Sequence, residues 1–349
     1  MNKNILKPKH YLFYAELSYS YSVLRPIEME LHKRGYQIAW FIPKGAEAEK
    51  FIDSKDILFQ SVEEVKKYQP DAVLAPGNYI PDFFPGIKVQ VFHGFDSGKK
   101  NKFNIRGFFD LYCTQGPNIT HAFNAINDGT CEIVETGWSK LDPLFTLHPD
   151  AEQYKSDKPL IFYAPTFSPQ LTSAYELYPQ IKELIKDKDW HWLIKLHPKA
   201  KAQEVAMFKG LAADTDNVQF IETSNIIPLL QAADVLLSDT SSILSEFALL
   251  RKPVVAFKNR RPKSWLINFT EADKLAKNLS YALQNNKEVI AAINAHCVKI
   301  HPHHDGKSSE RVVNAIDGLI RGTKHLKRKP LNLIRRLKVR KKLKYYRWN

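Results

Sequence analysis

Short apolar runs alternate with longer amphipathic stretches along the chain. Such runs, bounded by polar or glycine residues, are typical of strands buried in parallel sheets. In the first part of the chain they predict strands at 11–15, 37–42, 72–75, 89–92, 111–114 and 132–135. A helix is predicted from Ser22 to Arg34, closed by Gly35. The alternation of strands and helices predicts an α/β fold built on parallel sheets.

The pattern is interrupted between Thr146 and Pro159, where the residues are mostly polar and include proline. We place a domain boundary there. Beyond it, strands are predicted at 160–163, 192–195, 218–221, 235–237 and 254–257, and helices at 174–187, 201–213, 226–233, 241–250, 271–285, 287–298 and 307–322. The expected organisation is a Rossmann-like domain at 1–150, a second at 151–323 and a tail at 324–349. The two domains are expected to face a cleft.

The composition is that of an ordinary water-soluble globular chain. Its 349 residues are enough for two domains of usual size, and 44% hydrophobic with 25% charged residues is typical of such chains. No apolar run approaches the roughly 18 residues of a membrane span, and the N-terminus lacks the pattern of a signal peptide. The scattered cysteines, Cys113, Cys131 and Cys297, fit a reducing cytoplasm and suggest neither disulfides nor a metal site.

The positive charge of the chain is concentrated at its C-terminus. Residues 324–349 hold twelve Lys or Arg and no acidic residue, so subtracting them from the net charge of +14 leaves about +2 for the rest. The tail also carries apolar residues, and Leu333, Leu337, Tyr345 and Trp348 are expected on one side of a helix. Basic and apolar residues together favour an anionic membrane surface over a solvated tail. Nucleic-acid binding is disfavoured because the body is nearly neutral.

Polar residues follow several predicted strands. Ligands of open parallel sheets bind beyond the carboxyl ends of the strands, so these residues are candidates for a site in the cleft. They are His93 and Gly94 after 89–92, Thr166 after 160–163, Lys195 and His197 at the end of 192–195, and Asp239, Thr240, Ser241 and Ser242 after 235–237.

The run Asp239 to Ser242 contains more hydroxyl and acidic groups than one helix cap requires. Helix capping alone is one interpretation of these residues. A phosphate site, in which hydroxyls and free N–H groups hold anionic oxygens, is the other. Because neither a P-loop nor a Gly-rich dinucleotide fingerprint occurs, such a phosphate would be held in a different manner.

Lys195 and His197 are two residues apart, so along a strand they would share a face. Burying both in a core would be costly, whereas an exposed strand end facing an anion is favourable. A solvated strand terminus is the alternative. His93 precedes Gly94, which permits close backbone approach, although a lone histidine is most often structural.

Together these residues resemble the CDP-glycerol glycerophosphotransferase family of cell-envelope polymer enzymes. The similar segments, in chain order, are 92–94 (Phe-His-Gly), 137–142 (Gly-Trp-Ser-Lys-Leu-Asp), 163–166 (Tyr-Ala-Pro-Thr), 195–198 (Lys-Leu-His-Pro), 233–242, 247–253 and 305–311. They cover roughly residues 90–315. The resemblance implies a GT-B fold and metal-independent transfer of a polyol phosphate, most simply glycerol phosphate, from a CDP-activated donor, with release of CMP.

The resemblance also assigns roles to residues. It implies that His93 and His197 are the two active-site histidines and that Ser241 and Ser242 lie on the donor phosphates. The chain departs from the family where Phe167 and Ser168 replace a frequent Arg, at 95–99 after the His-Gly pair, and at Thr240, where Tyr is common. These departures bear on the donor alcohol and the acceptor more than on phosphate handling.

The expected mechanism is direct displacement at phosphorus by an acceptor hydroxyl of a glycan or lipid-linked molecule. His93, on the acceptor-side domain, is the candidate general base. His197 and Lys195, on the donor-side domain, would stabilise charge on the phosphoryl oxygens. Glu246 is a candidate for a ribose hydroxyl or a surface helix acid. Arg311 is either a phosphate contact or a solvated helix residue.

No metal or other cofactor is expected. The Asp-x-Asp pairs Asp187/Asp189 and Asp214/Asp216 fall in predicted turns, and the histidines of 301–304 fall in a loop without fitting partners. Two alternative functions also fit the sequence. One is a GT-B glycosyltransferase or sugar-nucleotide epimerase that uses a UDP-sugar. The other is a non-catalytic protein that binds anionic lipid or nucleic acid. The leading hypothesis places the enzyme in the cytoplasm, peripherally on the inner face of the cell membrane.

Overall fold

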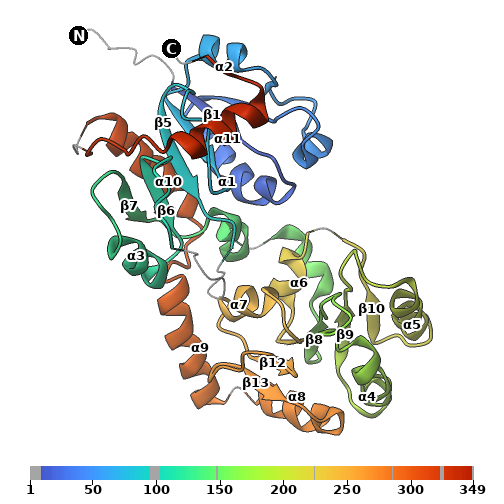
Figure 1. Cartoon of the computed structure of the whole chain (residues 1–349). Coiled ribbons are helices and arrows are strands. Elements are labelled where there is room, and N and C mark those ends of the chain that lie inside the picture. The colour runs from blue at the N-terminus through green and yellow to red at the C-terminus, as the bar shows by residue number, and fades with distance from the viewer. Residues whose placement is uncertain are drawn as a thin grey trace, which may run out of the picture. The chain divides into compact units, whose positions relative to one another are not determined.

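Two parallel sheets, each with its own helices, form the body of the protein (Figure 1). The computed structural model describes residues 9–94, 103–146, 148–223, 225–284, 286–322 and 326–347. The first compact unit comprises Met1–Asp142 and Ile300–Asn349, and the second comprises Pro143–Lys299. The chain after residue 300 therefore packs with the first unit, whereas the sequence pattern had grouped 300–323 with the second domain.

All seven strands of the first unit run parallel. They are β1 (His10–Tyr14), β2 (Gln37–Phe41), β3 (Leu58–Phe59), β4 (Ala72–Ala75), β5 (Ile87–Val91), β6 (Leu111–Thr114) and β7 (Glu132–Glu135). Their order across the sheet is β3-β2-β1-β4-β5-β6-β7. The order therefore reverses direction between β1 and β4.

The second unit has a parallel sheet of six strands. They are β8 (Leu160–Tyr163), β9 (His191–Ile194), β10 (Val218–Phe220), β11 (Val235–Ser238), β12 (Val254–Phe257) and β13 (Ile267–Phe269). The order β10-β9-β8-β11-β12-β13 reverses between β8 and β11. Such a reversal opens a crevice outside the carboxyl ends of the strands, which is the usual ligand position in these sheets.

The helices connect successive strands or extend the units. The first unit has α1 (Tyr19–Lys33), α2 (Val62–Tyr68), α3 (Pro117–Asn124), α10 (Ser308–Ile320), α11 (Leu333–Leu343) and the 3₁₀ turns η1 (Glu47–Phe51) and η2 (Ser139–Phe145), the last of which crosses the boundary. The second has η3 (Pro149–Tyr154), α4 (Ala174–Asp187), α5 (Ala202–Ala213), α6 (Ile227–Ala232), α7 (Ile243–Ala248), η4 (Ala272–Lys274), α8 (Leu275–Leu283) and α9 (Lys287–Ile300).

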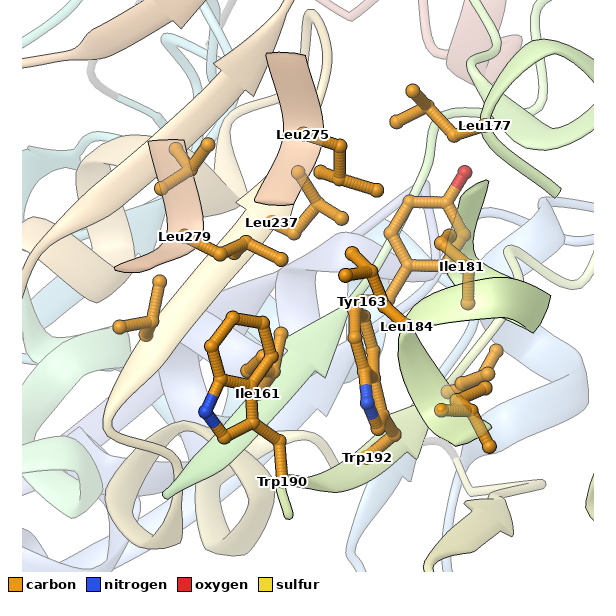
Figure 2. Packing of buried hydrophobic residues seen from close by; sticks show 14 of the residues in the cluster. Ile161, Tyr163, Leu177, Ile181, Leu184, Trp190, Trp192, Leu237, Leu275 and Leu279 are labelled. Carbon is orange, nitrogen blue, oxygen red and sulfur yellow. The ribbon is translucent and has the colours of Figure 1, made fainter. Parts of the chain in front are cut away.

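Helices α4 and α8 cover one face of the second sheet, as Figure 2 shows. The side chains that meet there are Leu177, Ile181 and Leu184 of α4, Leu275 and Leu279 of α8, and Ile161, Tyr163, Trp192 and Leu237 of the strands. The spacing of the α4 residues puts their side chains on one face of that helix. Because Ile161, Leu237 and Leu275 are all 0% exposed, this core anchors the strands whose ends form the candidate site.

Helix α10 joins the first unit through a buried acid. Asp317 accepts hydrogen bonds from Tyr11 of β1 at 3.1 Å and from Tyr36 at 3.3 Å. The Nζ of Lys9 lies 2.5 Å from the same carboxylate. These contacts to β1 and to the chain before β2 explain why α10 belongs to the first unit.

The tail packs against the first unit, and Figure 1 shows α11 beside α2. Arg340 is 4% exposed, with Nη2 3.0 Å from Asp82 Oδ2. The ring of Tyr345 stacks on Phe83 at 4.7 Å. The expectation that Tyr345 shares an outward face with Leu333 and Leu337 is therefore wrong, because both leucines are exposed.

Trp348 lies outside the described residues, so its expected place on the helix stays a prediction. Among the residues that the structure describes, no helix is both long and apolar enough to cross a bilayer.

We predict that Leu237→Ala lowers the free energy of unfolding by about 2–5 kcal/mol, because it leaves a cavity between β11 and the covering helices. The midpoint of urea unfolding measures this change. Val298→Ala is the matched control, since Val298 is 54% exposed and its truncation removes little buried surface. Equal midpoints for the two variants would contradict the assignment of Leu237 to the core.

Candidate active site

His93 lies just past the carboxyl end of β5 and is exposed. Its Nδ1 is 2.8 Å from the carbonyl oxygen of Pro76, which follows β4. Because a carbonyl only accepts, Nδ1 carries the proton, and Nε2 of the neutral ring keeps its lone pair. The ring stacks on Tyr19 of α1 at 4.6 Å. His93 is therefore held in the tautomer in which Nε2 is the nitrogen that can accept a hydrogen bond.

Gly94 is tied to the neighbouring strand end. Its carbonyl oxygen accepts a hydrogen bond from Nε2 of Gln115 at 2.7 Å, and Gln115 follows β6.

A carboxylate that the sequence analysis missed occupies the reversal point of the first sheet. Glu16 follows β1, and its Oε1 accepts hydrogen bonds from the hydroxyls of Tyr14 and Tyr79, each at 2.5 Å. Lys342 of α11 donates to Oε2 at 2.8 Å. Tyr79 lies in the segment after β4, so Glu16 connects the two strands between which the strand order reverses. The sequence signal was a polar residue directly after the predicted strand at 11–15.

Asp239 occupies the corresponding point of the second sheet, directly after β11. It is 0% exposed. One oxygen accepts from the backbone N–H of Thr166 at 3.0 Å and of Thr240 at 2.7 Å. The other accepts from the N–H and hydroxyl of Ser173, both at 3.0 Å. Burial raises the pKa of Asp239, and these hydrogen bonds act in the opposite direction. Asp239, expected to contact substrate, is thus committed to holding the loop after β8.

Ser241 and Ser242 lead from Asp239 into α7 and are not packed in the core. Ser241 is partly exposed and Ser242 is exposed. The N-cap residue Ser242 makes no side-chain capping hydrogen bond, and the N–H of Ile243 approaches the Ser241 hydroxyl only at 3.5 Å. Capping alone therefore does not account for these hydroxyls. The Thr240 hydroxyl accepts from the N–H of Arg260 at 3.2 Å.

His197 lies in the loop after β9 and is exposed. Its Nδ1 accepts the backbone N–H of Lys199 at 3.1 Å, so the proton of the neutral ring is on Nε2. Burial, with help from Lys195 and Lys199, lowers the pKa of His197 and favours the neutral form. Phe167 lies against the ring, with 4.3 Å between ring centroids. The neutral ring of His197 therefore presents an N–H donor at Nε2, whereas the neutral ring of His93 presents a lone pair at Nε2.

Lys195 also lies past its strand, since β9 ends at Ile194. The side chain is partly buried, and burial lowers its pKa. The positive charge of Lys195 disfavours protonation of His197 and so helps to lower the pKa of that imidazole. Thr166 contributes its backbone N–H to Asp239.

In the second unit, the sequence analysis missed the segment after β12, which lies beside the Asp239 loop. Asn259 donates its Nδ2 to the carbonyl of Asp239 at 2.7 Å, which fixes this segment beside the Asp239 loop. Arg260 and Arg261 follow and are exposed. The signal was the basic run Lys258 to Lys263, which directly follows a predicted strand.

The two remaining candidates have different surroundings. Glu246 on α7 is 4% exposed, so the alternative of a surface helix acid is wrong. Arg311, on α10 of the first unit, pairs with both carboxylate oxygens of Asp305, one at 3.1 Å. Arg311 is thus not fully solvated, because its guanidinium is held in an ion pair.

His301, in the loop before α10, has structural surroundings. His301 is 0% exposed, and its Nε2 accepts the backbone N–H of Trp138 at 2.9 Å. Within the described ranges, no group of three or more His, Cys, Asp or Glu residues has a geometry that could hold a metal ion.

We predict that the imidazole of His197 titrates below its ordinary pKa of 6.5, as followed by NMR of the ring. When the pH falls through that pKa, Nδ1 becomes protonated and loses the hydrogen bond from Lys199. Phe167→Ala exposes the ring to water, which stabilises the charged form, so the pKa should rise. Phe51→Ala, which removes an exposed ring of the first unit, is the control. A pKa unchanged by Phe167→Ala would contradict this account.

The chain is similar to proteins of teichoic acid synthesis. A sequence model of the family described as CDP-Glycerol:Poly(glycerophosphate) glycerophosphotransferase matches residues 94–261. The teichoic acid glycerol-phosphate primase of Bacillus subtilis (strain 168) is 27% identical over 176 residues, which are 47% of this chain and 44% of that protein. The corresponding primase of Bacillus spizizenii is 33% identical over 107 residues, which are 30% of this chain and 27% of that protein. The matched segments thus span less than half of these curated relatives.

Solved structures show the same fold at low sequence identity. The wall teichoic acid polymerase TagF matches with a TM-score of 0.63 and 16% identity, covering 91% of each chain. A putative UDP-N-acetylglucosamine 2-epimerase from Listeria monocytogenes also matches with a TM-score of 0.63 and 16% identity, covering 91% of this chain and 98% of its own. These matches confirm the expected α/β fold of GT-B type. By sequence, the chain is similar over residues 94–261 to the CDP-glycerol:poly(glycerophosphate) glycerophosphotransferase family.

Proposed function

We propose that the protein transfers a polyol phosphate, most simply glycerol phosphate, from a CDP-activated donor to an acceptor hydroxyl and releases CMP. The observation that carries this proposal is the pair of exposed histidines with opposite tautomers. His93 offers a lone pair on Nε2, and His197 offers an N–H. One can accept the proton of an attacking hydroxyl, while the other can donate to a phosphoryl oxygen.

The proposed step is an in-line displacement. The acceptor oxygen forms a bond to the phosphorus that carries the polyol, and its proton passes to Nε2 of His93. The bond from that phosphorus to the bridging oxygen of the diphosphate breaks, and CMP leaves with the bonding electrons. Nε2–H of His197 and the ammonium of Lys195 stabilise the negative charge on the phosphoryl oxygens.

The second unit supplies the groups proposed to bind the donor diphosphate. Ser241 and Ser242 carry hydroxyls that are not used up by capping. Arg260 and Arg261 are exposed in the segment that hydrogen bonds from Asn259 and from the Arg260 N–H fix beside Asp239 and Thr240. Asp239 has a supporting role, because its buried carboxylate fixes the loop that carries Thr166 and Phe167.

The relatives support this substrate class. Their names include glycerol-phosphate primases and a poly(ribitol-phosphate) polymerase. TagF has been solved with a histidine substituted and soaked with CDPG. The alternative of a UDP-sugar substrate rests on similarity of fold to epimerases. At 16% identity, such similarity shows the fold and not the reaction. We therefore propose a glycan or lipid-linked acceptor of the cell envelope.

We predict that His93→Asn lowers turnover of CDP-glycerol with a membrane-derived acceptor by about 10²–10⁴-fold, the usual contribution of a general base. His197→Asn should lower it by about 10²–10³-fold through loss of the phosphoryl donor. The measurement is CMP release, with UDP-sugars tested in parallel. His32→Asn is the control, because His32 is exposed in the last turn of α1. Full CMP release by His93→Asn, or release of UDP instead of CMP, would contradict the proposal.

We also propose that the outer face of α11 attaches the protein to an anionic membrane. Leu333, Ile334 and Leu337 are 52%, 73% and 47% exposed, and Leu337 lies about one turn after the adjacent pair Leu333 and Ile334. The surrounding tail is strongly basic. Exposed apolar side chains flanked by cations suit the interface of an anionic bilayer. With the three cysteines free and buried, this supports peripheral attachment at the cytoplasmic face of the membrane.

We predict that the protein sediments with phosphatidylglycerol vesicles more than with phosphatidylcholine vesicles, and less at high salt. The double variant Ile334→Ser/Leu337→Ser should reduce sedimentation, because it removes the apolar contact. Val298→Ser, at an exposed apolar position of the second unit, should not. Undiminished vesicle binding by the double variant would show that this face is not the attachment surface.

A further inference from the structure

The C-terminal segment reaches the reversal point of the first sheet with one side chain. Lys342 of α11 places its Nζ 2.8 Å from Oε2 of Glu16 and 2.5 Å from the hydroxyl of Tyr79. Burial lowers the pKa of Lys342, but its hydrogen bonds to Glu16 and Tyr79 raise the pKa by more. The net pKa is therefore raised, and the ammonium stays charged. The tail thus supplies a cation to the same edge of the sheet on which His93 lies.

The group that Lys342 contacts joins the segments after β1 and β4. Glu16 follows β1, and Tyr79 follows β4 and donates to the Glu16 carboxylate. The Tyr14 hydroxyl donates to it as well. Three donors converge on one carboxylate, so Glu16, Tyr79 and Lys342 form a clamp across the point where the strand order reverses.

This clamp lies next to both groups that hold His93. The Pro76 carbonyl that accepts from His93 Nδ1 is three residues before Tyr79, in the same segment. Tyr19, which stacks on His93, has its pKa raised by burial and by the charge of Glu16. Movement of Glu16 or Tyr79 would therefore displace the hydrogen-bond acceptor and the stacking partner of the ring.

The position of Lys342 is determined by the buried residues around it in the tail. Arg340 pairs with Asp82, and its guanidinium lies 4.5 Å from the centroid of the Phe83 ring. Tyr345 accepts a hydrogen bond from Lys66 at 2.6 Å and is 7% exposed. Lys342 stands between these two anchors, so its own contacts are not needed to keep α11 docked.

We propose that Lys342 is a positioning residue, which clamps Glu16 and Tyr79 and thereby orients His93 for catalysis. This inference rests on the proposed function of His93. The side chain of Lys342 is 51% exposed, and ion pairs this exposed contribute little to stability, about 0–1 kcal/mol. Removing the ammonium should therefore leave the protein folded and affect the orientation of His93.

The test measures CMP release from CDP-glycerol without membranes, using a short water-soluble glycerol-phosphate oligomer as acceptor and the full chain. Lys342→Met should lower kcat about tenfold, the scale of a small misplacement of a catalytic group. KM for CDP-glycerol should not change, because the proposed donor groups lie in the second unit. Lys342→Arg should restore most of kcat.

The control is Lys155→Met, which breaks a surface ion pair of similar length and exposure. Lys155 lies 2.7 Å from Glu152 and its side chain is 54% exposed. This variant should match the wild-type kcat. If Lys342→Met also matches it while His93→Asn is inactive, the positioning role is overturned and the proposed function stands. If His93→Asn is fully active, the proposed function itself fails.

A second measurement does not depend on turnover. The ¹⁵N shifts of His93 report which ring nitrogen carries the proton, and in the wild type it is Nδ1. Lys342→Met, Glu16→Gln and Tyr79→Phe should each shift the ring toward a mixture of tautomers. In a combined Glu16→Gln/Lys342→Met variant, the shift toward mixed tautomers should be no larger than in the single variant with the larger shift, because both substitutions act through one clamp. An unchanged Nδ1–H tautomer in all of them would overturn the inference.

Discussion

Every strand pair in both sheets is parallel, and this constraint determines where the candidate site residues lie. All strands of a parallel sheet end at the same edge, and in each unit the order reverses beside the first strand of that unit. The loops diverge at this point, and a carboxylate holds them together. Glu16 has this role in the first unit and Asp239 in the second. In both units, the loop that the carboxylate holds also carries a contact to a histidine.

The two histidines differ in protonation because their backbone partners differ. A carbonyl oxygen faces Nδ1 of His93, whereas an N–H faces Nδ1 of His197. A carbonyl can only accept and an amide N–H can only donate, so the proton is on opposite nitrogens of the two neutral rings. One exposed nitrogen can thus accept a hydrogen bond and the other can donate one. These are the complementary properties on which the proposed phosphoryl transfer to a hydroxyl relies.

The tail combines two kinds of contact on one short helix. The last turn of α11 meets the acid Asp82 and the ring of Phe83, which offset the cost of burying Arg340. The first turn keeps Leu333 and Ile334 in contact with water. A basic and apolar composition is therefore consistent both with docking on the protein and with the proposed attachment to a bilayer, and the two ends of the helix separate these roles.

The sequence by itself determined the parallel α/β fold, the central strands and the two histidines at strand ends, because hydrophobic periodicity and position after a strand are local properties. The edge strands β3 and β13 were missed, since their apolar runs are too short to stand out. Only the tertiary structure decided that Asp239 is buried and fully hydrogen-bonded, and that the tail docks through Arg340 and Lys342. These outcomes depend on partners more than sixty residues away in the chain, such as Thr166, Asp82 and Glu16, and the local pattern holds no information about such partners.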